Sequence, residues 1–148
     1  MPHKMPTQSL YDFISKTPLI FSKTLSKQTQ RKVWLKLESQ QPTGSFKVRP
    51  AFQGILKNLE AAKTKGVLTT SSGNYAQAVA YAASILNVKA TIVMTKDTSP
   101  YKIRKTNDWG AEVVFCENSF ESRFEMLEKL KLERGSHVLH GFDSLETI

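Results

Sequence analysis

Two short segments of the chain carry the side chains best suited to chemistry. In the first, Thr43-Gly44-Ser45-Phe46-Lys47, a turn-forming glycine and a capping serine come just before a lysine at the predicted start of a helix. A helix N-terminus carries positive partial charge and disfavours a cation, so this setting favours the neutral, nucleophilic form of Lys47. A neutral lysine can form a Schiff base. Taken alone, the segment also fits a solvated lysine on a first helical turn.

The second segment, Ser71-Ser72-Gly73-Asn74, lies between a predicted strand and the helix that follows it. In open parallel sheets, ligands bind beyond the carboxyl ends of the strands. A loop of small residues at a helix N-terminus also leaves backbone N–H groups free for an anion. The loop therefore predicts a carboxylate or phosphate ligand. An ordinary helix cap explains the same residues, because serine and asparagine are common cappers.

A regular alternation of strands and helices must position these two segments. The pattern predicts strands at 33–37, 66–70, 90–94, 111–115 and 137–139, and helices at 9–14, 46–63, 76–86, 100–109 and 119–134. The 46–63 helix places Ala51, Ile55 and Leu59 on one face. Strands that alternate with helices indicate βαβ units, and hence an open parallel sheet with right-handed crossovers.

Composition narrows the class of protein. The 148 residues are 40% hydrophobic and 23% charged, as in ordinary soluble domains, and no apolar run is long enough to cross a membrane. Residues 1–10 lack the apolar core of a secretory signal. The single cysteine, Cys116, predicts a buried strand-end thiol and a reducing compartment, and we expect a cytoplasmic protein.

The positive charge raises the alternative of a nucleic-acid partner. The net charge is +8, and residues 1–37 hold seven basic residues against one acid. No RNA-binding aromatic motif or zinc finger accompanies them, and the histidines have no metal-ligand spacing. Solvated lysines explain the charge better, and a basic nucleic-acid-binding module is kept as the remote alternative.

Taken together, the segments resemble a known family. Lys36-Leu37-Glu38, Pro42 to Arg49, and Ser71 to Asn74 with Ala76-Gln77 resemble, in order and separation, the fold-type II pyridoxal-phosphate enzymes. Within that group they are most similar to threonine/serine dehydratases and serine racemases. The resemblance runs from about Pro18 to Ile148. It implies a tryptophan synthase β-like fold: a segment and strand of an otherwise absent large domain at 1–45, a small α/β domain at 46–140, and a truncated return to the large domain at 141–148.

The resemblance also implies roles for particular residues. Lys47 would bind pyridoxal 5'-phosphate as a Schiff base and then act as the base at the substrate Cα. Phe46 would pack near the cofactor ring, and Asn74 would hydrogen-bond the ring's phenolic oxygen. The substrate carboxylate would be held by the loop Ser71, Ser72, Gly73 and Asn74, with Ser71 as acid/base on the opposite face.

The implied reaction is β-elimination of L-threonine or L-serine to a 2-oxo acid and ammonia. Threonine against serine, and elimination against racemisation, stay open. The implied partner is a small amino acid rather than a nucleic acid or a membrane, and full-length relatives are expected to form homo-oligomers.

Three departures from the family pattern bear on this interpretation. Pro50 stands where the family usually has glycine, and a proline inside a helix costs about 3 kcal/mol unless the geometry accommodates it. Tyr75 stands where the family usually has histidine. The seven glycines are scattered with no two adjacent, so no glycine-rich phosphate loop is present, and we expect weak cofactor binding. A truncated, catalytically inactive remnant of such an enzyme is therefore the main alternative.

Overall fold

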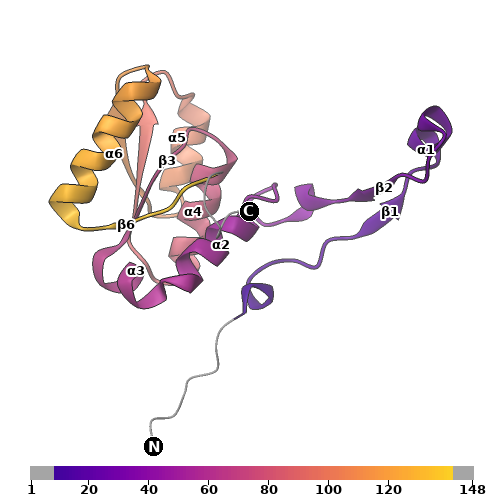
Figure 1. The fold of residues 1–148 in the computed structure, drawn as a ribbon, viewed down its shortest axis with the longest axis horizontal. Coiled ribbons are helices and arrows are strands. Elements are labelled where there is room, and N and C mark those ends of the chain that lie inside the picture. The colour runs from indigo at the N-terminus through magenta and orange to yellow at the C-terminus, as the bar shows by residue number, and fades with distance from the viewer. Residues whose placement is uncertain (1–8, 142–148) are drawn as a thin grey trace, which may run out of the picture.

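The computed structural model describes residues 9–141, which form an α/β domain and an arm that projects from it (Figure 1). The arm and its approach contain η1 (Leu10–Asp12), β1 (Leu19–Phe21), α1 (Lys23–Thr29), β2 (Trp34–Lys36) and η2 (Glu38–Gln40). The domain contains α2 (Val48–Lys57), α3 (Leu59–Lys65), β3 (Val67–Thr70), α4 (Asn74–Ile85), β4 (Ala90–Thr95), α5 (Pro100–Asn107), β5 (Glu112–Cys116), α6 (Phe120–Arg134) and β6 (His137–Val138). No helix in this stretch is both long and apolar enough to cross a membrane.

The predicted parallel sheet is confirmed. Its four strands lie in the order β5-β4-β3-β6, and all three pairings are parallel. Val67 pairs with Ala90 in β4 and with His137 in β6, so β3 is a central strand. The loops that follow β3 and β4 therefore lie at the same edge of the sheet. That edge carries the Ser71–Asn74 segment.

Helices cover both faces of the sheet, because alternate strand residues point to opposite sides. On one side, Ile92 and Met94 pack with Phe52 of α2 and Val79 of α4 in the larger core. On the other, Leu68, Val93 and Cys116 pack with Leu127 and Leu130 of α6. Cys116 is buried at the end of β5, as predicted. This double cover explains why β3 and β4 are almost continuously buried.

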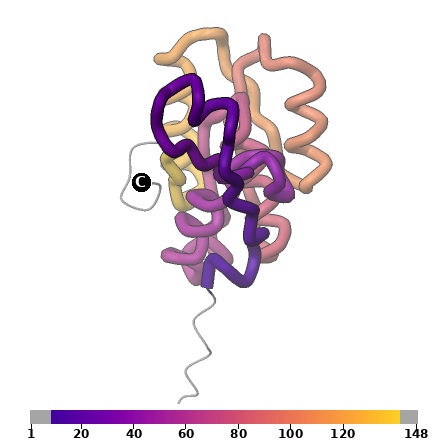
Figure 2. Tube along the Cα trace, turned by 90° about the vertical axis from the view of Figure 1, so that its right-hand side faces the viewer, coloured from indigo at the N-terminus to yellow at the C-terminus, as the bar shows by residue number. Residues whose placement is uncertain are grey.

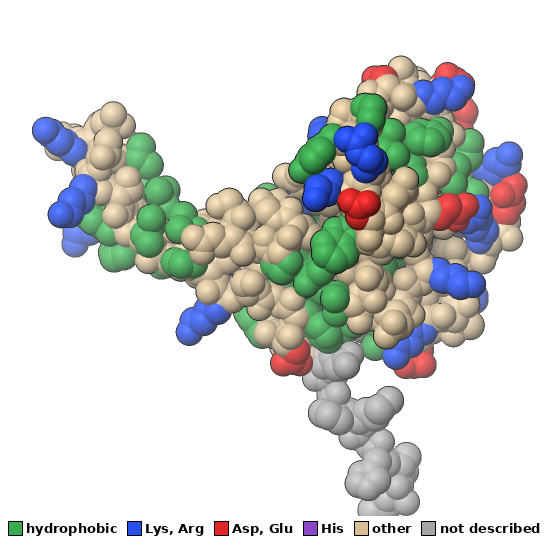
Figure 3. Space-filling model, turned by 180° about the vertical axis from the view of Figure 1, so that it is seen from behind, with side chains coloured by type: hydrophobic (Ala, Val, Ile, Leu, Met, Phe, Trp, Pro, Cys, Tyr) green, Lys and Arg blue, Asp and Glu red, His purple; other side chains and the backbone are tan. Residues whose placement is uncertain are grey.

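The arm, residues 19–36, forms a separate antiparallel sheet. Leu19 pairs with Lys36 and Phe21 with Trp34, and α1 joins the two strands at the far end. Figure 2, turned by 90° from Figure 1, shows the arm crossing in front of the domain. Apolar side chains line it and basic ones stand at its far end (Figure 3). The arm exposes a third or more of each of Leu19, Ile20, Phe21, Leu25, Trp34 and Leu35.

The predicted 46–63 helix is wrong in its extent. Two helices, α2 and α3, replace it, and Asn58 (φ −126°, ψ 35°) separates them. The Asn58 Nδ2 lies 3.2 Å from the His137 Nε2. A contact with β6, distant in the sequence but in the same domain, therefore favours the break. Ala51 and Ile55 are fully buried as predicted, whereas Leu59, after the break, is only half-buried.

Gly66 ends α3 in a backbone conformation that favours glycine, at φ 75° and ψ 176°. A Cβ at this position would lie 2.9 Å from the Lys89 carbonyl oxygen, which belongs to the backbone and cannot move aside easily. We expect Gly66→Ala to lower the free energy of unfolding by about 2 kcal/mol in urea denaturation.

The control is Gly135→Ala, at the end of α6. Gly135 is also left-handed, at φ 63°, but its nearest neighbour to a built Cβ is a lysine side-chain carbon 3.9 Å away. The control keeps the backbone strain and removes the clash, so it should destabilise by about 1 kcal/mol. Equal losses in the two variants would contradict the steric argument.

Candidate functional site

Lys47 lies at the N-cap of α2, with helical backbone angles of φ −62° and ψ −16°. The prediction of a helix start at this lysine is therefore confirmed to within two residues. The predicted serine cap is wrong, because the N-cap of α2 receives no side-chain hydrogen bond. The Ser45 hydroxyl is buried and has no partner among residues 9–141.

Pro50 does not disturb the placement of Lys47. It is the third residue of α2, and the N–H groups of a first helical turn have no acceptor inside the helix. The missing proline donor therefore leaves no helical hydrogen bond unmade. Arg49 N donates to Phe46 O (3.0 Å), and Ala51 N donates to Lys47 O (3.2 Å), so the turn is complete on either side of the ring. The predicted penalty of a proline inside the helix does not apply.

The Lys47 amine is enclosed by residues from three parts of the chain. Its Nζ donates to the Gly141 carbonyl oxygen at 2.8 Å. It also lies 5.1 Å from the ring centroid of Phe46 and 5.8 Å from that of Tyr75. Tyr75 directly follows Asn74, so the start of α2 and the start of α4 meet at this amine. The two segments selected from the sequence are thus brought together.

Tyr75 is a buried residue beside the Lys47 amine and packs against Gly141. Its side chain is only 5% exposed, and a Cβ at Gly141 would lie 2.9 Å from its ring. The phenol oxygen has no hydrogen-bond partner among residues 9–141. Burial raises the pKa of the Tyr75 phenol above its ordinary value, so it stays neutral and can donate a proton to a ligand.

The residues around Lys47 fit an aromatic aldehyde with polar substituents. Phe46 exposes 54% of its surface beside the amine, which leaves an aromatic face for a planar ring. Buried hydroxyls of Ser45 and Tyr75 lack partners, and buried polar groups are normally satisfied. Ligand oxygens or nitrogens would satisfy them. The site therefore suits the ring and aldehyde of pyridoxal phosphate, while the scattered glycines offer no cradle for its phosphate.

The Ser71–Asn74 loop has the geometry of an anion site. It follows β3 and precedes α4, whose first residue, Asn74, is exposed. The Ser71 Oγ accepts from Gly73 N at 3.3 Å, which folds the loop back on itself. The N–H groups at the start of α4 have no intrahelical acceptor and carry the positive end of the helix dipole. A carboxylate at the loop would accept hydrogen bonds from these N–H groups and would be attracted by the positive end of the helix dipole.

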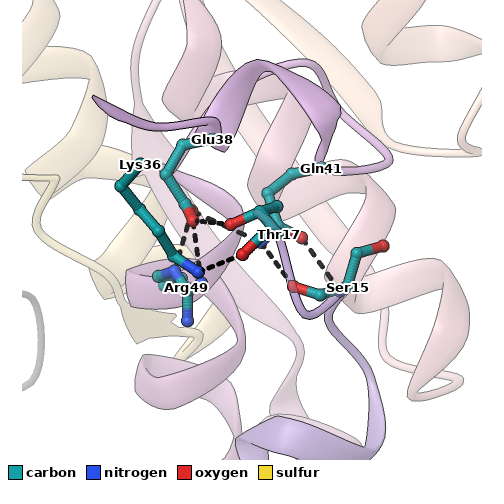
Figure 4. Close-up of polar contacts among 6 residues, drawn as sticks. All are labelled: Ser15, Thr17, Lys36, Glu38, Gln41 and Arg49. Atoms are coloured by element: carbon teal, nitrogen blue, oxygen red, sulfur yellow. Dashed lines mark hydrogen bonds and ion pairs between the residues drawn. The ribbon is translucent and has the colours of Figure 1, made fainter. Parts of the chain in front are cut away.

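A partly buried cluster of polar groups holds the segment that leads into Lys47 (Figure 4). Glu38 accepts two hydrogen bonds from Arg49, at 2.8 and 2.9 Å, and one from the Thr17 hydroxyl at 2.6 Å. The Arg49 guanidinium, followed by the Thr17 and Gln41 hydrogen bonds, lowers the Glu38 pKa to about 2. Because Arg49 belongs to α2, the pair ties the residues after β2 to the helix that begins beside Lys47.

Gln41 extends this cluster to the N-terminal segment. Its side-chain Nε2 donates to Ser15 O at 2.9 Å, and Ser15 N donates to its Oε1 at 3.0 Å. Gln41 is only 3% exposed, so both bonds are shielded from water. The cluster fixes both ends of the 38–49 segment and leaves the Thr43–Phe46 turn held between them.

A cavity of about 630 Å³ is lined in part by Phe46. Its walls include Tyr11, Ile14, Lys36 and Arg49, from the N-terminal segment, β2 and α2. Neither Lys47 nor any residue of the Ser71–Asn74 loop lines it. The geometry of the amine and the loop therefore identifies the candidate site better than the volume of this cavity does.

Two contacts at the site could not be found from the sequence. Gly141 lies 94 positions after Lys47, and only the fold brings its carbonyl to the amine. Thr98, after β4, donates to the Ser72 hydroxyl at 2.9 Å. Its distance from Ser72 in the sequence hides this contact, although the parallel sheet places both residues at the same edge. No motif includes either residue.

Comparisons with known proteins identify the family of the chain. The family described as "Pyridoxal-phosphate dependent enzyme" matches residues 10–148. An L-threo-3-hydroxyaspartate ammonia-lyase of a Pseudomonas species is 38% identical over 136 residues, which cover 92% of this chain and 43% of that protein. An L-threonine ammonia-lyase of Thermotoga maritima is 36% identical over 145 residues, which cover 98% of this chain and 36% of that protein.

A solved structure shows the same arrangement of elements. Maize serine racemase aligns with a TM-score of 0.87 and 30% identity over 93% of this chain and 42% of its own. The chain thus spans less than half the length of these relatives. Its parallel sheet and its helices have the arrangement found in fold-type II enzymes. The chain belongs to the pyridoxal-phosphate-dependent enzyme family.

Proposed function

We propose that this chain carries the catalytic lysine and the substrate-carboxylate loop of an ammonia-lyase that acts on L-threonine or L-serine. One observation carries the proposal: Lys47 Nζ lies 5.8 Å from the ring of Tyr75, the residue that follows the Ser71–Asn74 loop. This distance supports an arrangement in which a nucleophilic amine lies beside an anion-binding helix start. An α-amino acid needs both, one for its Cα proton and one for its carboxylate.

Each residue has a defined task in this proposal. When bound, pyridoxal phosphate supplies an electron sink that makes the substrate Cα acidic. Lys47 would hold the cofactor through its aldehyde, and its amine would act as the base that takes the substrate Cα proton. Phe46 packs on the cofactor ring, and Asn74 donates to its phenolic oxygen. The loop Ser71, Ser72, Gly73 and Asn74 holds the carboxylate.

Ser71 is proposed as the acid/base on the opposite face of the substrate. Its Oγ accepts from Gly73 N, and an accepted hydrogen bond leaves the hydroxyl proton available for donation. A protonated β-hydroxyl leaves as water, so a donor on this face would assist elimination. The same donor could return a proton to Cα, which is why racemisation is the competing outcome.

The arm supports the proposed division of the chain. Residues 1–45 are proposed to pack into a large domain, 46–140 to form the small domain, and 141–148 to return to the large domain. The exposed apolar side chains of the arm are the kind of surface that a further domain would cover. The buried thiol of Cys116 suits a reducing compartment, and we place the enzyme in the cytoplasm as part of the same proposal.

Product analysis tests the proposed reaction. The chain, and a longer version joined to a second half like that of its relatives, would each be incubated with pyridoxal phosphate and L-threonine or L-serine. We expect 2-oxo acid and ammonia from the longer version and little from this chain alone, whose glycines offer no phosphate cradle. Formation of D-serine without 2-oxo acid would favour racemisation. Absence of every product in both would favour the inactive remnant.

A further inference from the structure

A row of hydroxyl groups connects the carboxylate loop to a charged residue on the opposite side of the sheet edge. Arg123 of α6 donates from Nη2 to the Thr95 Oγ1 at 3.2 Å. The Thr95 Oγ1 lies 3.3 Å from the Thr98 Oγ1, and the Thr98 hydroxyl donates to the Ser72 Oγ at 2.9 Å. Thr95 is 3% exposed and Thr98 is 7% exposed, so the middle of the row is closed to water.

The direction of the hydroxyl protons along this row is fixed at one end. A guanidinium group can only donate, so Thr95 must accept from Arg123 and keeps its own proton to donate. Between Thr95 and Thr98 either hydroxyl could donate, but the single proton of Thr98 is given to Ser72, so Thr98 accepts from Thr95. Thr98 in turn donates to Ser72. Each hydroxyl thus donates its hydrogen bond in the direction of the loop. The Ser72 proton has no acceptor within the row and is free to donate to a ligand.

Arg123 is well suited to set this direction. Within residues 9–141 it forms no ion pair, because none of the carboxylates described lies within 4.0 Å of it. Among residues 9–141 its one hydrogen bond to a side chain is therefore the one to Thr95, which begins the hydroxyl row. Hydrogen bonds in such a row polarise one another, and each strengthens the donor at the next position. The effect ends at Ser72, on the loop proposed to bind a carboxylate.

We infer that Arg123, Thr95 and Thr98 are positioning residues that hold the Ser72 hydroxyl as a proton donor toward the substrate carboxylate. The inference deepens the proposed function and rests on it. A carboxylate only accepts hydrogen bonds, so a serine whose proton points elsewhere would repel it. Because the Ser72 oxygen accepts the Thr98 proton, the Ser72 hydroxyl proton does not point back at Thr98 and is available to the carboxylate.

The test measures the affinity of the unmodified 148-residue chain for L-serine, by NMR titration of the amide signals of residues 71–74. We expect Thr98→Val, which removes the hydroxyl and keeps the shape, to weaken binding about fivefold, the equivalent of one net hydrogen bond. Thr98→Ser restores the hydroxyl and should restore the affinity. Arg123→Met should weaken binding in the same direction, since it frees the Thr95 proton to reverse.

Thr106→Val is the matched control. Thr106 is fully buried in α5, and its hydroxyl donates to the Lys102 carbonyl oxygen at 3.0 Å, within its own helix. Its replacement removes an equally buried hydroxyl outside the row and should leave L-serine binding unchanged. If the row affected binding only through the stability of the fold, Thr98→Val and Thr106→Val would weaken L-serine binding equally. That result would overturn the inference.

The outcomes separate this inference from the proposed function. A parent chain that shows no L-serine-dependent shifts at residues 71–74 would contradict the carboxylate loop itself and the role of the row with it. A parent that binds L-serine, with equal binding by Thr98→Val, would contradict the row and leave the loop standing. In the unliganded chain, a nuclear Overhauser effect from the Thr98 hydroxyl proton to the Ser72 β-protons supports the stated direction. The same effect to Thr95 instead would overturn it.

Discussion

Lys47→Ala is expected to eliminate the visible absorbance that the longer version develops when it is mixed with pyridoxal phosphate. Only an amine bonded to the cofactor aldehyde gives this band, and Lys47 is the amine held between Phe46 and Tyr75. Its hydrogen bond to the Gly141 carbonyl orients it without an anionic partner among residues 9–141, so no ion pair must be broken before it reacts. The measurement is a spectral titration with pyridoxal phosphate.

Lys63→Ala provides the control for this titration. Lys63 is an exposed residue of α3 and takes no part in the site, so its replacement should leave the band unchanged. Borohydride reduction followed by peptide mapping should place the cofactor on Lys47. A band that survives in Lys47→Ala, or a label found on another lysine, would rule out the assignment.

Glu38→Ala is expected to lower the free energy of unfolding by about 3 kcal/mol. The substitution leaves the guanidinium of Arg49 without its two hydrogen bonds and removes the acceptor of the Thr17 hydroxyl. The Glu38 side chain is 17% exposed and that of Arg49 is 27% exposed, so water replaces these bonds only in part. Chemical denaturation followed by circular dichroism measures the loss.

A second ion pair of the same chemistry provides the control. Glu112 pairs with Arg134, but these side chains are 51% and 38% exposed. Exposed pairs contribute about 0–1 kcal/mol, so Glu112→Ala should have a small effect. If the two variants lose equal stability, the special role of the Glu38 cluster is wrong. A weaker affinity for pyridoxal phosphate in Glu38→Ala would show in addition that the cluster positions Lys47.

The free energy of unfolding at low pH gives an independent measure of the contribution of Glu38. The pKa of Glu38 falls from an ordinary 4.5 to about 2 in the folded chain. A group with a lowered folded pKa stabilises fully above its unfolded value and loses that contribution as the pH falls through the folded one. The Glu38 contribution should therefore decline between about pH 4.5 and pH 2. Glu38→Gln should flatten this part of the stability profile.

The fold could be predicted largely from local pattern. Val67–Thr70 and Ala90–Thr95 read as buried strands because they are short, apolar and bounded by turn residues. The pairing of Ser119 and Gly135 predicted both ends of α6. The break at Asn58 escaped prediction because the apolar spacing continues through it. The Asn58 side chain at the break contacts His137, which is nearly eighty positions away along the chain.

The site was predictable only in part, for the same reason. Lys47 and the Ser71–Asn74 loop stand out as residue types in suggestive settings, and their placement on neighbouring helices follows from the alternating elements. Pro50 looked disruptive because its place within the helix depends on the helix start, which is the least certain boundary in a sequence. Thr98 and Gly141 became visible only when the chain was folded. Residue patterns identify local elements of the chain, whereas the contacts of a site join residues that are far apart in the sequence.

The burial of Cys116 makes its labelling rate a measure of local opening in this domain. The thiol is 4% exposed, and its Sγ donates to the Met94 carbonyl oxygen of the adjacent strand at 3.5 Å. It is the one cysteine in 148 residues, so a thiol reagent has a single place to react. That reaction requires an opening that exposes Cys116, either between β5 and β4 or between β5 and Leu127 and Leu130 of α6. The labelling rate therefore counts openings at the outer strand of the sheet, and a ligand that draws the two strand-end loops together will slow it.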